Sequence, residues 1–521
     1  MWDYLIVGAG SSGCALASEL VKAGRTVLIL EAGGRDRSPF IKVAAGQVRA
    51  CAAHDWGYQS EPDPTRNGAR DAWIRGRVLG GSSSINGTMY TRGSAGDFDR
   101  WQLPGWAWSD VLPIFKEMEH SDQPGSLRGH AGPLHVRTVR RPHPVTRAFV
   151  ESAGAAGLPF NADYNGETQE GVAYAQLSQR RGFRCSAADA FLKPLLGRRN
   201  LKLLLKTTVE RLEFKGGRII GVSCLEEGRK FRESAAHVIL CAGTINTPKL
   251  LMHSGVGDKE ELERHGIKVV AHVPAVGRHL KEQPMISLIY RSKVPTYNLT
   301  GGWRQKAAFA REFLLHGEGP ISNLFEAGAV LRSTASRPVP DLQMIFAAFG
   351  FEIGPDGLYR LSPYPSVMLH VMESYPASSG RIRIVSSDPK ARPLIECRLL
   401  EAPADEDGLV AGISRAREIM REKPIAGLLD EEIAPGADIN GEARMHEYVR
   451  SHAGISFHPI GTCRMGVDSD SVLEPTLRVR GFDNLWVADA SVIPEHMSAN
   501  MNAVCLMLGR KLGKELAAHA S

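Results

Sequence analysis

The sequence predicts an α/β fold in which a doubly wound, Rossmann-like nucleotide-binding domain is joined to a second, sheet-based domain. Three observations support this fold class. The chain has 521 residues, about twice the length at which a single core stops growing. It opens with a strand, a glycine turn, a helix and another strand, and a later region is richer in aromatic residues and strand-like runs. At least two domains with separate cores are therefore expected.

The opening unit has the order and length of the start of a dinucleotide-binding fold. Two apolar runs, Tyr4–Val7 and Thr26–Leu30, flank a helical pattern at Cys14–Lys22. Such a unit crosses over with a right hand, which makes its two strands parallel.

The turn in this unit has the glycine spacing of a phosphate-binding loop. Gly8 permits a tight turn, Gly10 lets the backbone approach a pyrophosphate, and Gly13 lets the helix pack on the strand. Phosphates would then lie on the amides that begin the helix. Glu31 ends the second strand, where a carboxylate accepts hydrogen bonds from a ribose. A glycine-rich surface turn is the simpler alternative, and the turn alone does not separate FAD from NAD.

Charge, cysteines and hydropathy exclude several other classes. The net charge is +6 and the basic residues are scattered, so no nucleic-acid surface is expected. The eight cysteines show no paired spacing, which favours free thiols and no metal. The first strand begins too early for a signal peptide, and no apolar run has the length of a membrane span. We expect a cytoplasmic protein, with docking on a membrane surface left open.

Later segments suggest how the two domains alternate along the chain. A hairpin is predicted from strands at Leu201–Val209 and Arg218–Val222, and a buried strand and closing helix at Leu485–Asp489 and Asn502–Leu516. The predicted nucleotide domain covers residues 1–145, 200–282 and 455–521. The second domain covers residues 146–199 and 283–454.

A second glycine-rich segment makes a family resemblance specific. Residues 75–92, with Arg75-Gly76-Arg77-Val78-Leu79-Gly80-Gly81-Ser82-Ser83-Ser84-Ile85-Asn86-Gly87, resemble the first signature of the glucose-methanol-choline (GMC) flavoproteins. Residues 243–257 resemble the second signature. The segment Phe457–Gly466, together with residues 487–491 and 500–503, resembles the carboxyl-terminal signature. Three ordered blocks over nearly the whole chain make chance similarity very unlikely.

The resemblance implies FAD and a substrate domain whose antiparallel sheet covers the flavin. It places Glu31 on the adenosine ribose, the Val209 backbone at the adenine, and Asp489 near the ribityl and pyrophosphate chain. Some family members attach FAD through a histidine at the position of Ile85, so non-covalent FAD is expected here. The implied cofactor-binding residues are Gly8, Gly10, Ser11, Ser12, Gly13, Glu31, Ala32, Arg75, Val78, Gly80, Gly81, Ser82, Asn86, Gly87, Thr88, Met89, Val209, Ala242, Gly243, Asp489, Ala490, Asn502 and Ala503.

Alcohol oxidation requires a neutral base for the hydroxyl proton, and histidine serves this role near neutral pH. The resemblance assigns the base to His458 and the residue that positions the substrate oxygen to Asn502. Taken alone, His458 would be read as structural and Asn502 as a helix cap. His452 is interpreted as structural.

The expected activity is oxidation of a primary alcohol to the aldehyde, with O2 or another electron acceptor reoxidising the flavin. An aromatic, furanic or medium-chain alcohol is favoured because residues 346–364 are rich in aromatic side chains, although these also suit a core. Choline is the alternative, with Glu326 as a guess for its carboxylate partner. A hydroxynitrile lyase, a photodecarboxylase and a binding protein with a vestigial flavin are the rivals. The sequence leaves monomer and homodimer open.

Overall fold

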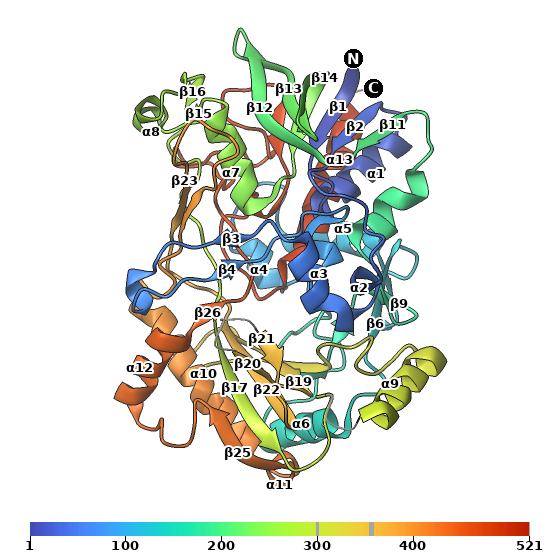
Figure 1. The fold of residues 1–521 in the computed structure, drawn as a ribbon, viewed down its shortest axis with the longest axis vertical. Helices are drawn as coiled ribbons and strands as arrows, with labels where there is room; N and C mark the ends of the chain where they lie inside the picture. The colour runs from blue at the N-terminus through green and yellow to red at the C-terminus, as the bar shows by residue number, and fades with distance from the viewer. Residues whose placement is uncertain (299–301, 354–358, 520–521) are drawn as a thin grey trace.

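The computed structural model describes residues 1–298, 302–353 and 359–519. Its two large sheets lie at opposite ends of the molecule in Figure 1, with the long connections of the first 100 residues between them. The first sheet has five parallel strands in the order β11 (Leu201–Leu204), β2 (Val27–Leu30), β1 (Trp2–Val7), β14 (Arg229–Leu240) and β27 (Leu485–Val487). The first half of β14, residues 229–234, pairs with β13 (Arg218–Glu226), and β13 pairs with β12 (Thr207–Lys215), so these strands form an antiparallel ribbon.

The predicted strand at residues 201–209 is two strands in the structure. β11 pairs with β2, whereas β12 pairs with β13. The chain bends between them at Lys206, whose φ of 55° takes the backbone out of the extended conformation. The predicted hairpin is confirmed as the pair of β12 and β13.

Helices α1 (Ser11–Lys22) and α13 (Met501–His519) pack directly on one another beside this sheet. The close approach depends on glycine, because a Cβ on Gly509 would lie 2.1 Å from the Ser12 carbonyl oxygen. Ser12 Oγ donates to the Cys505 carbonyl at 2.7 Å across the same contact. The first and last helices therefore form one layer, which brings the chain's carboxyl-terminal signature to the opening glycine turn.

The second sheet is antiparallel, as the resemblance implied. Its order is β25 (Leu429–Ala434), β17 (Pro284–Ser292), β22 (Ser366–Glu373), β19 (Leu342–Ala347), β18 (Ala327–Leu331) and β7 (Gly171–Tyr174), with β26 (Gly454–Ile455) also on β17. Helices α6 (Pro144–Ala155) and α10 (Pro403–Arg421) cover its outer face. The core there includes Leu288, Phe346, Leu369 and Ile413. Its inner face is turned toward the first domain.

Two segments depart from the predicted domain boundaries. Phe191 and Leu192, in a π-helical turn at Ala188–Leu192 that packs on α1, belong to the core of the first sheet. Ile382 and Ile395 also belong to it, because the hairpin of β23 (Arg381–Arg383) and β24 (Leu394–Glu396) lies near α7 (Gly243–His253). Both segments were assigned to the second domain from their position along the chain.

Shorter elements complete the described structure. They are α2 (Pro39–Lys42), α3 (Gln47–His54), β3 (Tyr58–Gln59), β4 (Ala72–Trp73), α4 (Ala95–Asp99), α5 (Trp108–Met118), β5 (Glu119–Ser121), β6 (Leu134–Thr138), β8 (Gln176–Leu177), β9 (Gln179–Arg180), β10 (Phe183–Arg184), β15 (Val256–Gly257), α8 (Lys259–Arg264), β16 (Ala271–His272), α9 (Gly302–His316), β20 (Phe351–Ile353), β21 (Tyr359–Leu361), α11 (Ile425–Leu428) and α12 (Glu442–His452), with short 3-10 turns at Ala44–Gly46, Pro64–Arg66, Gly81–Ser84, Lys193–Leu195 and Ala490–Val492. Across the described ranges, no helix has both the length and the apolar character needed to span a membrane.

Candidate active site

Four predicted cofactor-binding positions follow the ends of neighbouring parallel strands. Gly8 follows β1, Glu31 follows β2, Ala242 lies just past β14, and Asp489 lies just past β27. In open α/β sheets, ligands bind at this carboxyl edge, where the strand order reverses. The fold therefore gathers residues that are up to 481 positions apart in the sequence at one edge.

The glycine turn is crowded at two positions and open at the third. Gly8 has a φ of 103°, and a Cβ there would lie 2.4 Å from the Cys241 carbonyl oxygen. A Cβ on Gly13 would lie 2.0 Å from the Gly8 carbonyl oxygen. At Gly10 the nearest atom to an added Cβ is the Gly81 Cα, at 4.0 Å. Gly8 and Gly13 thus shape the turn, while Gly10 leaves space for a ligand.

The second glycine-rich segment packs against this turn. The Gly80 amide donates to the Ala9 carbonyl at 2.8 Å, and a Cβ on Gly81 would lie 2.8 Å from the Gly10 Cα. The backbones of the two glycine-rich segments therefore meet beside the start of α1, with Gly10 and Gly81 at the contact. This cradle fits the pyrophosphate of a dinucleotide, which needs exposed amides and no obstructing side chain.

Glu31 is buried beside the same turn. Its Oε2 accepts from the Ala9 amide at 2.9 Å and its Oε1 from the Gly33 amide at 2.7 Å. Burial raises the pKa of Glu31 to about 7, although both amides favour the ionised form. The carboxylate is thus held with lone pairs left for ribose hydroxyls, as the FAD assignment requires.

The Asp489 carboxylate forms hydrogen bonds with the start of α7 and with the turn that follows β27. Its Oδ2 accepts from the Gly243 amide at 2.8 Å and from Thr247 Oγ1 at 2.6 Å, and its Oδ1 accepts from the Ser491 amide at 2.9 Å. Burial raises its pKa. In the structure this carboxylate fixes the start of α7 against the turn after β27.

His458 is held by antiparallel pairing between the segment before β17 and the segment after β26. Ser456 donates its amide to the Gln283 carbonyl, and Lys281 exchanges backbone hydrogen bonds with Ile460. Phe457, directly before the histidine, has a φ of 66°. A left-handed conformation at a bulky residue costs about 1–3 kcal/mol and persists where the surroundings fix it, often at functional sites.

The hydrogen-bond network defines which ring nitrogen of His458 is protonated. Gln283 Nε2 donates to the carbonyls of Ser374 and Met497, so its Oε1 is left to face His458 Nδ1 at 2.8 Å. A carbonyl oxygen only accepts, and therefore Nδ1 carries the proton. Nε2 then presents a lone pair, as a base must.

The structure changes the predicted partner of His458 from Asn502 to Asn500. Asn500 Nδ2 donates to His458 Nε2 at 3.1 Å, and Asn500 Oδ1 accepts from Thr91 Oγ1 at 3.0 Å. Asn502 instead accepts, through Oδ1, from Ser11 Oγ at 2.8 Å in the glycine turn. Asn502 is the second residue of α13, so its side chain lies at the α1 contact, whereas Asn500 precedes the helix. Asn502 therefore keeps its predicted place beside the cofactor site but loses the predicted pairing with His458.

A buried carboxyl group, that of Glu282, lies behind His458. Glu282 Oε1 accepts from the amides of His458 and Gln283 and from Ser456 Oγ, and Arg75 is near enough to lower its pKa. Burial still raises the pKa of Glu282 to about 7. Burial, helped by the Arg75 charge, lowers the pKa of His458 to about 3, so the imidazole is neutral at physiological pH.

Arg75 also has unused donors. Its Nε and Nη2 are buried without a hydrogen-bond partner in the described structure. Leaving charged donors unpaired is costly, so these atoms indicate a missing acceptor. A flavin bound at this edge, rich in carbonyl and ring-nitrogen acceptors, suits that position.

The remaining predicted residues lie on the segments that border this edge. Ser82 Oγ accepts from the Gly76 amide, Asn86 Oδ1 accepts from Arg184 and from the Thr88 amide, and Val209 lies at a bulge in β12. The rest lie on the chain next to these positions, and they are Ala32, Val78, Gly87, Met89, Ala490 and Ala503.

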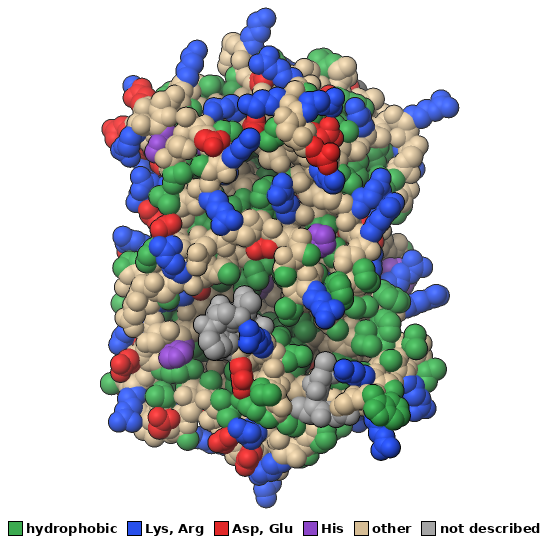
Figure 2. Space-filling model, in the orientation of Figure 1, with side chains coloured by type: hydrophobic (Ala, Val, Ile, Leu, Met, Phe, Trp, Pro, Cys, Tyr) green, Lys and Arg blue, Asp and Glu red, His purple; other side chains and the backbone are tan. Residues whose placement is uncertain are grey.

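The inner face of the second sheet closes the other side of the site. Alternate residues of β17, namely Met285, Ser287 and Ile289, are half-buried on this face. Ser287 Oγ lies 2.8 Å from His370 Nδ1 on β22. The Phe325 ring lies 6.0 Å from the His370 ring and against Gly87 of the second glycine segment. In Figure 2 the middle of the visible face is hollowed, with hydrophobic side chains around the recess.

Two residues considered for substrate contacts lie away from the site. Glu326 points to the outer face, where it accepts from the His143 amide, Thr146 Oγ1 and Tyr297 Oη, so it is no partner for a substrate cation. Phe346 stacks on Phe149 in the outer core with ring centroids 4.5 Å apart. In both cases strand alternation turned the side chain away from the site.

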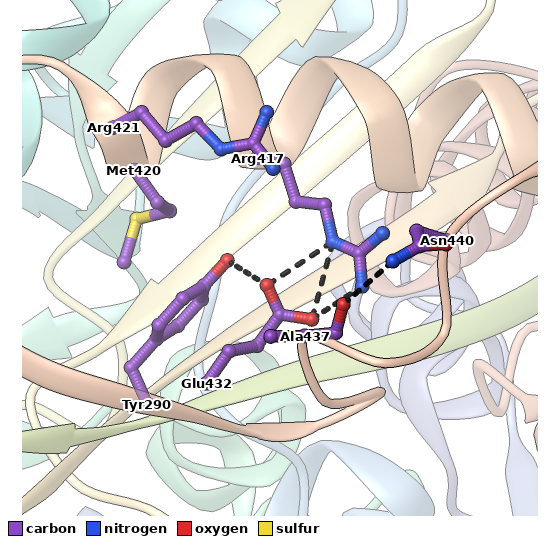
Figure 3. Close-up of a pocket in the computed structure, with 7 residues that line it drawn as sticks. All are labelled: Tyr290, Arg417, Met420, Arg421, Glu432, Ala437 and Asn440. Atoms are coloured by element: carbon purple, nitrogen blue, oxygen red, sulfur yellow. Dashed lines mark hydrogen bonds and ion pairs between the residues drawn. The ribbon is translucent and has the colours of Figure 1, made fainter.

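A pocket on the outer face is a separate feature (Figure 3). It lies between β17, α10 and the loop after β25, and Glu432 in it accepts from Tyr290 Oη at 2.9 Å and from Arg417. These internal pairs already use the Glu432 carboxylate and the Arg417 guanidinium, so among its described lining residues the pocket offers no free carboxylate or imidazole as a base for alcohol chemistry. Within the described ranges, no group of three or more His, Cys, Asp or Glu side chains is arranged to hold a metal ion.

Comparison with known proteins agrees with this geometry. The profile of the GMC oxidoreductase family matches residues 2–285 and, in its carboxyl-terminal part, residues 376–509. An oxygen-dependent choline dehydrogenase of Rhizobium etli is 37% identical over 98% of this chain and 96% of its own length. One from Sinorhizobium fredii is 38% identical over the same shares. The crystal structure of pyridoxine 4-oxidase from Mesorbium loti superposes with a TM-score of 0.91 at 28% identity and full coverage of both chains.

The chain belongs to the GMC oxidoreductase family. It is an FAD-dependent alcohol oxidoreductase with the fold of that family. Sequence reasoning found His458 and the glycine segments but missed Glu282, Gln283 and Asn500. Asn500 lay inside a matched signature, two residues from the one chosen. Glu282 and Gln283 lie outside the matched blocks and carried no signal.

Proposed function

We propose that this protein oxidises a primary alcohol to its aldehyde, with His458 as the base. The supporting observation is the His458 imidazole, whose Nδ1 proton is fixed by Gln283 and whose Nε2 faces Asn500. FAD, when bound, accepts the hydride from the alcohol carbon. His458 Nε2 takes the hydroxyl proton, and Asn500 Nδ2 donates to the substrate oxygen as negative charge develops there.

The same contacts argue against the hydroxynitrile lyase alternative. Hydroxynitrile lyases on this fold are expected to carry a second histidine where Asn500 stands. An amide orients and stabilises an oxygen but takes up no proton.

We further propose that FAD binds without a covalent bond, because Ile85 occupies the attachment position and is buried in an apolar cluster with Ile41 and Val78.

Choline is the first candidate substrate, because relatives that match nearly the whole chain are named choline dehydrogenases. A neutral alcohol is the second candidate, favoured by the inner face of the second sheet. Among the described residues of β17, β22 and β19, that face carries methionine, isoleucine, Arg291, Gln343 and the Ser287–His370 pair, and no carboxylate. Burial lowers the pKa of His370 to about 4, so this pair is uncharged. The pair suits a hydroxyl or carbonyl on the substrate, whereas a quaternary ammonium group would have the Phe325 ring but no carboxylate on this face of the described strands as its partner.

Anaerobic titration of the holoenzyme with choline, benzyl alcohol and hydroxymethylfurfural tests the proposal. We expect a primary alcohol to bleach the flavin absorption band, and His370→Phe to raise the KM of a neutral polar alcohol more than it changes kcat. Bleaching by choline alone, with no effect of His370→Phe, would favour the first candidate. A flavin that no alcohol bleaches would contradict the proposed oxidation.

The two asparagines give a matched pair of variants. We expect Asn500→Ala to slow flavin reduction about a hundredfold, the scale of losing one donor to a developing oxyanion, while FAD stays bound. We expect Asn502→Ala to weaken FAD binding, because Asn502 contacts Ser11 in the phosphate turn. Stopped-flow reduction and FAD dissociation constants separate the effects, and a larger rate loss in Asn502→Ala would reverse the assignment.

A further inference from the structure

A surface outside the site combines exposed apolar side chains with unpaired positive charge. Helix α9 (Gly302–His316) has no buried residue, and Trp303, Leu314 and Leu315 are 75%, 79% and 62% exposed. In Figure 1 the helix lies at the lower right edge of the molecule, and in Figure 2 hydrophobic side chains gather over this edge, with Lys and Arg side chains around them. Monomeric proteins rarely leave such groups exposed together without a use.

The helix is attached through one side only. Phe309 lies against the Tyr297 ring, at 5.6 Å between centroids, and Phe313 against the Phe183 ring at 5.1 Å. Glu312 pairs with Arg141 at 2.5 Å. At 100° per residue, Trp303, Ala307 and Leu314 fall on the opposite side, within one stripe.

The apolar surface extends beyond the helix. Phe183 is 46% exposed and Phe40 is 37% exposed, and the two segments are joined because Arg184 Nε donates to the Ile41 carbonyl at 2.8 Å. Phe40 and Phe183 therefore add exposed apolar side chains beside the attached side of α9, and we call these two residues and the outer stripe of α9 the patch.

The charge around this patch has one sign. Arg304, Lys306 and Arg311 flank the stripe and are exposed, and they form no ion pair within the described residues. The one acidic side chain of α9, Glu312, is turned inward to Arg141. An interfacial helix has this composition, with Trp and Leu on the apolar side and only basic residues beside it.

We propose that this patch docks the protein on an anionic lipid surface, with Trp303 and Leu314 entering the interface and the three basic residues contacting headgroup phosphates. A second copy of the chain is a poorer occupant, because a two-fold contact would bring the same positive charges together. Each Lys or Arg near an anionic membrane contributes about 1 kcal/mol, equivalent to about a fivefold change in partition.

The test is sedimentation of the FAD-loaded protein with vesicles of phosphatidylcholine mixed with phosphatidylglycerol, and with phosphatidylcholine alone. We expect binding to the anionic vesicles only. The paired change Trp303→Ser with Leu314→Ser should reduce partition at least about tenfold, and each of Arg304→Glu, Lys306→Glu and Arg311→Glu by about fivefold or more. Val467→Ser is the matched control, because Val467 is 69% exposed and lies near the Arg464 and Asp468 pair.

Flavin absorption and alcohol-driven bleaching should be unchanged in all these variants, which shows that they fold. Absence of binding to anionic vesicles, or binding that the α9 variants leave intact, would overturn the proposal. Light scattering that shows a dimer dissociated by the Trp303 and Leu314 changes, without lipid binding, would assign the patch to a second copy and also overturn it.

Discussion

Replacing His458 with Ala is expected to leave FAD bound and to slow its reduction by alcohol about a thousandfold or more, the combined scale of a lost base and a lost orienting contact. The imidazole is the group whose free nitrogen faces Asn500. Its removal leaves the glycine turn and Glu31 untouched. Anaerobic stopped-flow absorption at the flavin band measures the rate directly.

His452→Ala is the matched control for this variant. His452 is exposed and stacks on Tyr448 at the end of α12, with ring centroids 4.1 Å apart. We expect its loss to change the rate of flavin reduction very little. A His458→Ala enzyme that reduces flavin at the normal rate would refute the assignment of the base.

Substitutions in the glycine turn should separate folding from cofactor binding. Gly13→Ala is expected to destabilise the protein by about 2–4 kcal/mol, because its Cβ would lie 2.0 Å from the Gly8 carbonyl oxygen. Gly10→Val should fold, since an added Cβ at Gly10 has no protein atom closer than 4.0 Å. It should nevertheless lose FAD affinity by about a hundredfold, or about 2.7 kcal/mol, because the side chain occupies the space left for the pyrophosphate.

Thermal unfolding of the apoprotein and FAD titration measure these two effects. Gly24→Ala is a control within the same opening unit, because an added Cβ at Gly24 meets no atom within 4 Å, although its φ of 82° adds some strain. If Gly10→Val binds FAD normally, the cofactor does not cross the turn at Gly10.

The part of the fold that could be predicted is the part specified by local spacing. The strand, turn and helix around Gly8–Gly13 need particular residues at particular steps, so the opening unit and the place of Glu31 were readable from one sequence. His458 was identified through its signature. The parallel edge that gathers Asp489 and Gly243 follows from the same fold.

The rest depends on contacts between distant segments. Whether Asn500 or Asn502 meets His458 is set by where α13 begins, and helix ends are poorly defined by sequence. Gln283 reaches His458 because β17 pairs with β26, a pairing in which Pro284 lies opposite Ile455 although 171 positions separate them in the sequence. Glu326 and Phe346 were misjudged because a single residue of strand register decides which face a side chain occupies.

The contact between α1 and α13 has a consequence for biosynthesis. Tyr4 Oη donates to the Leu516 carbonyl, and the N and C labels lie side by side in Figure 1. The phosphate turn is translated long before Asn500, which faces His458, and Asn502, which contacts Ser11 in that turn. A nascent chain that lacks α13 exposes the apolar side of α1 and holds neither a complete cofactor site nor a paired base. The cofactor site therefore cannot be completed before α13 has left the ribosome, and chaperones that shield α1 until then are expected to influence the yield of the enzyme more than its final stability.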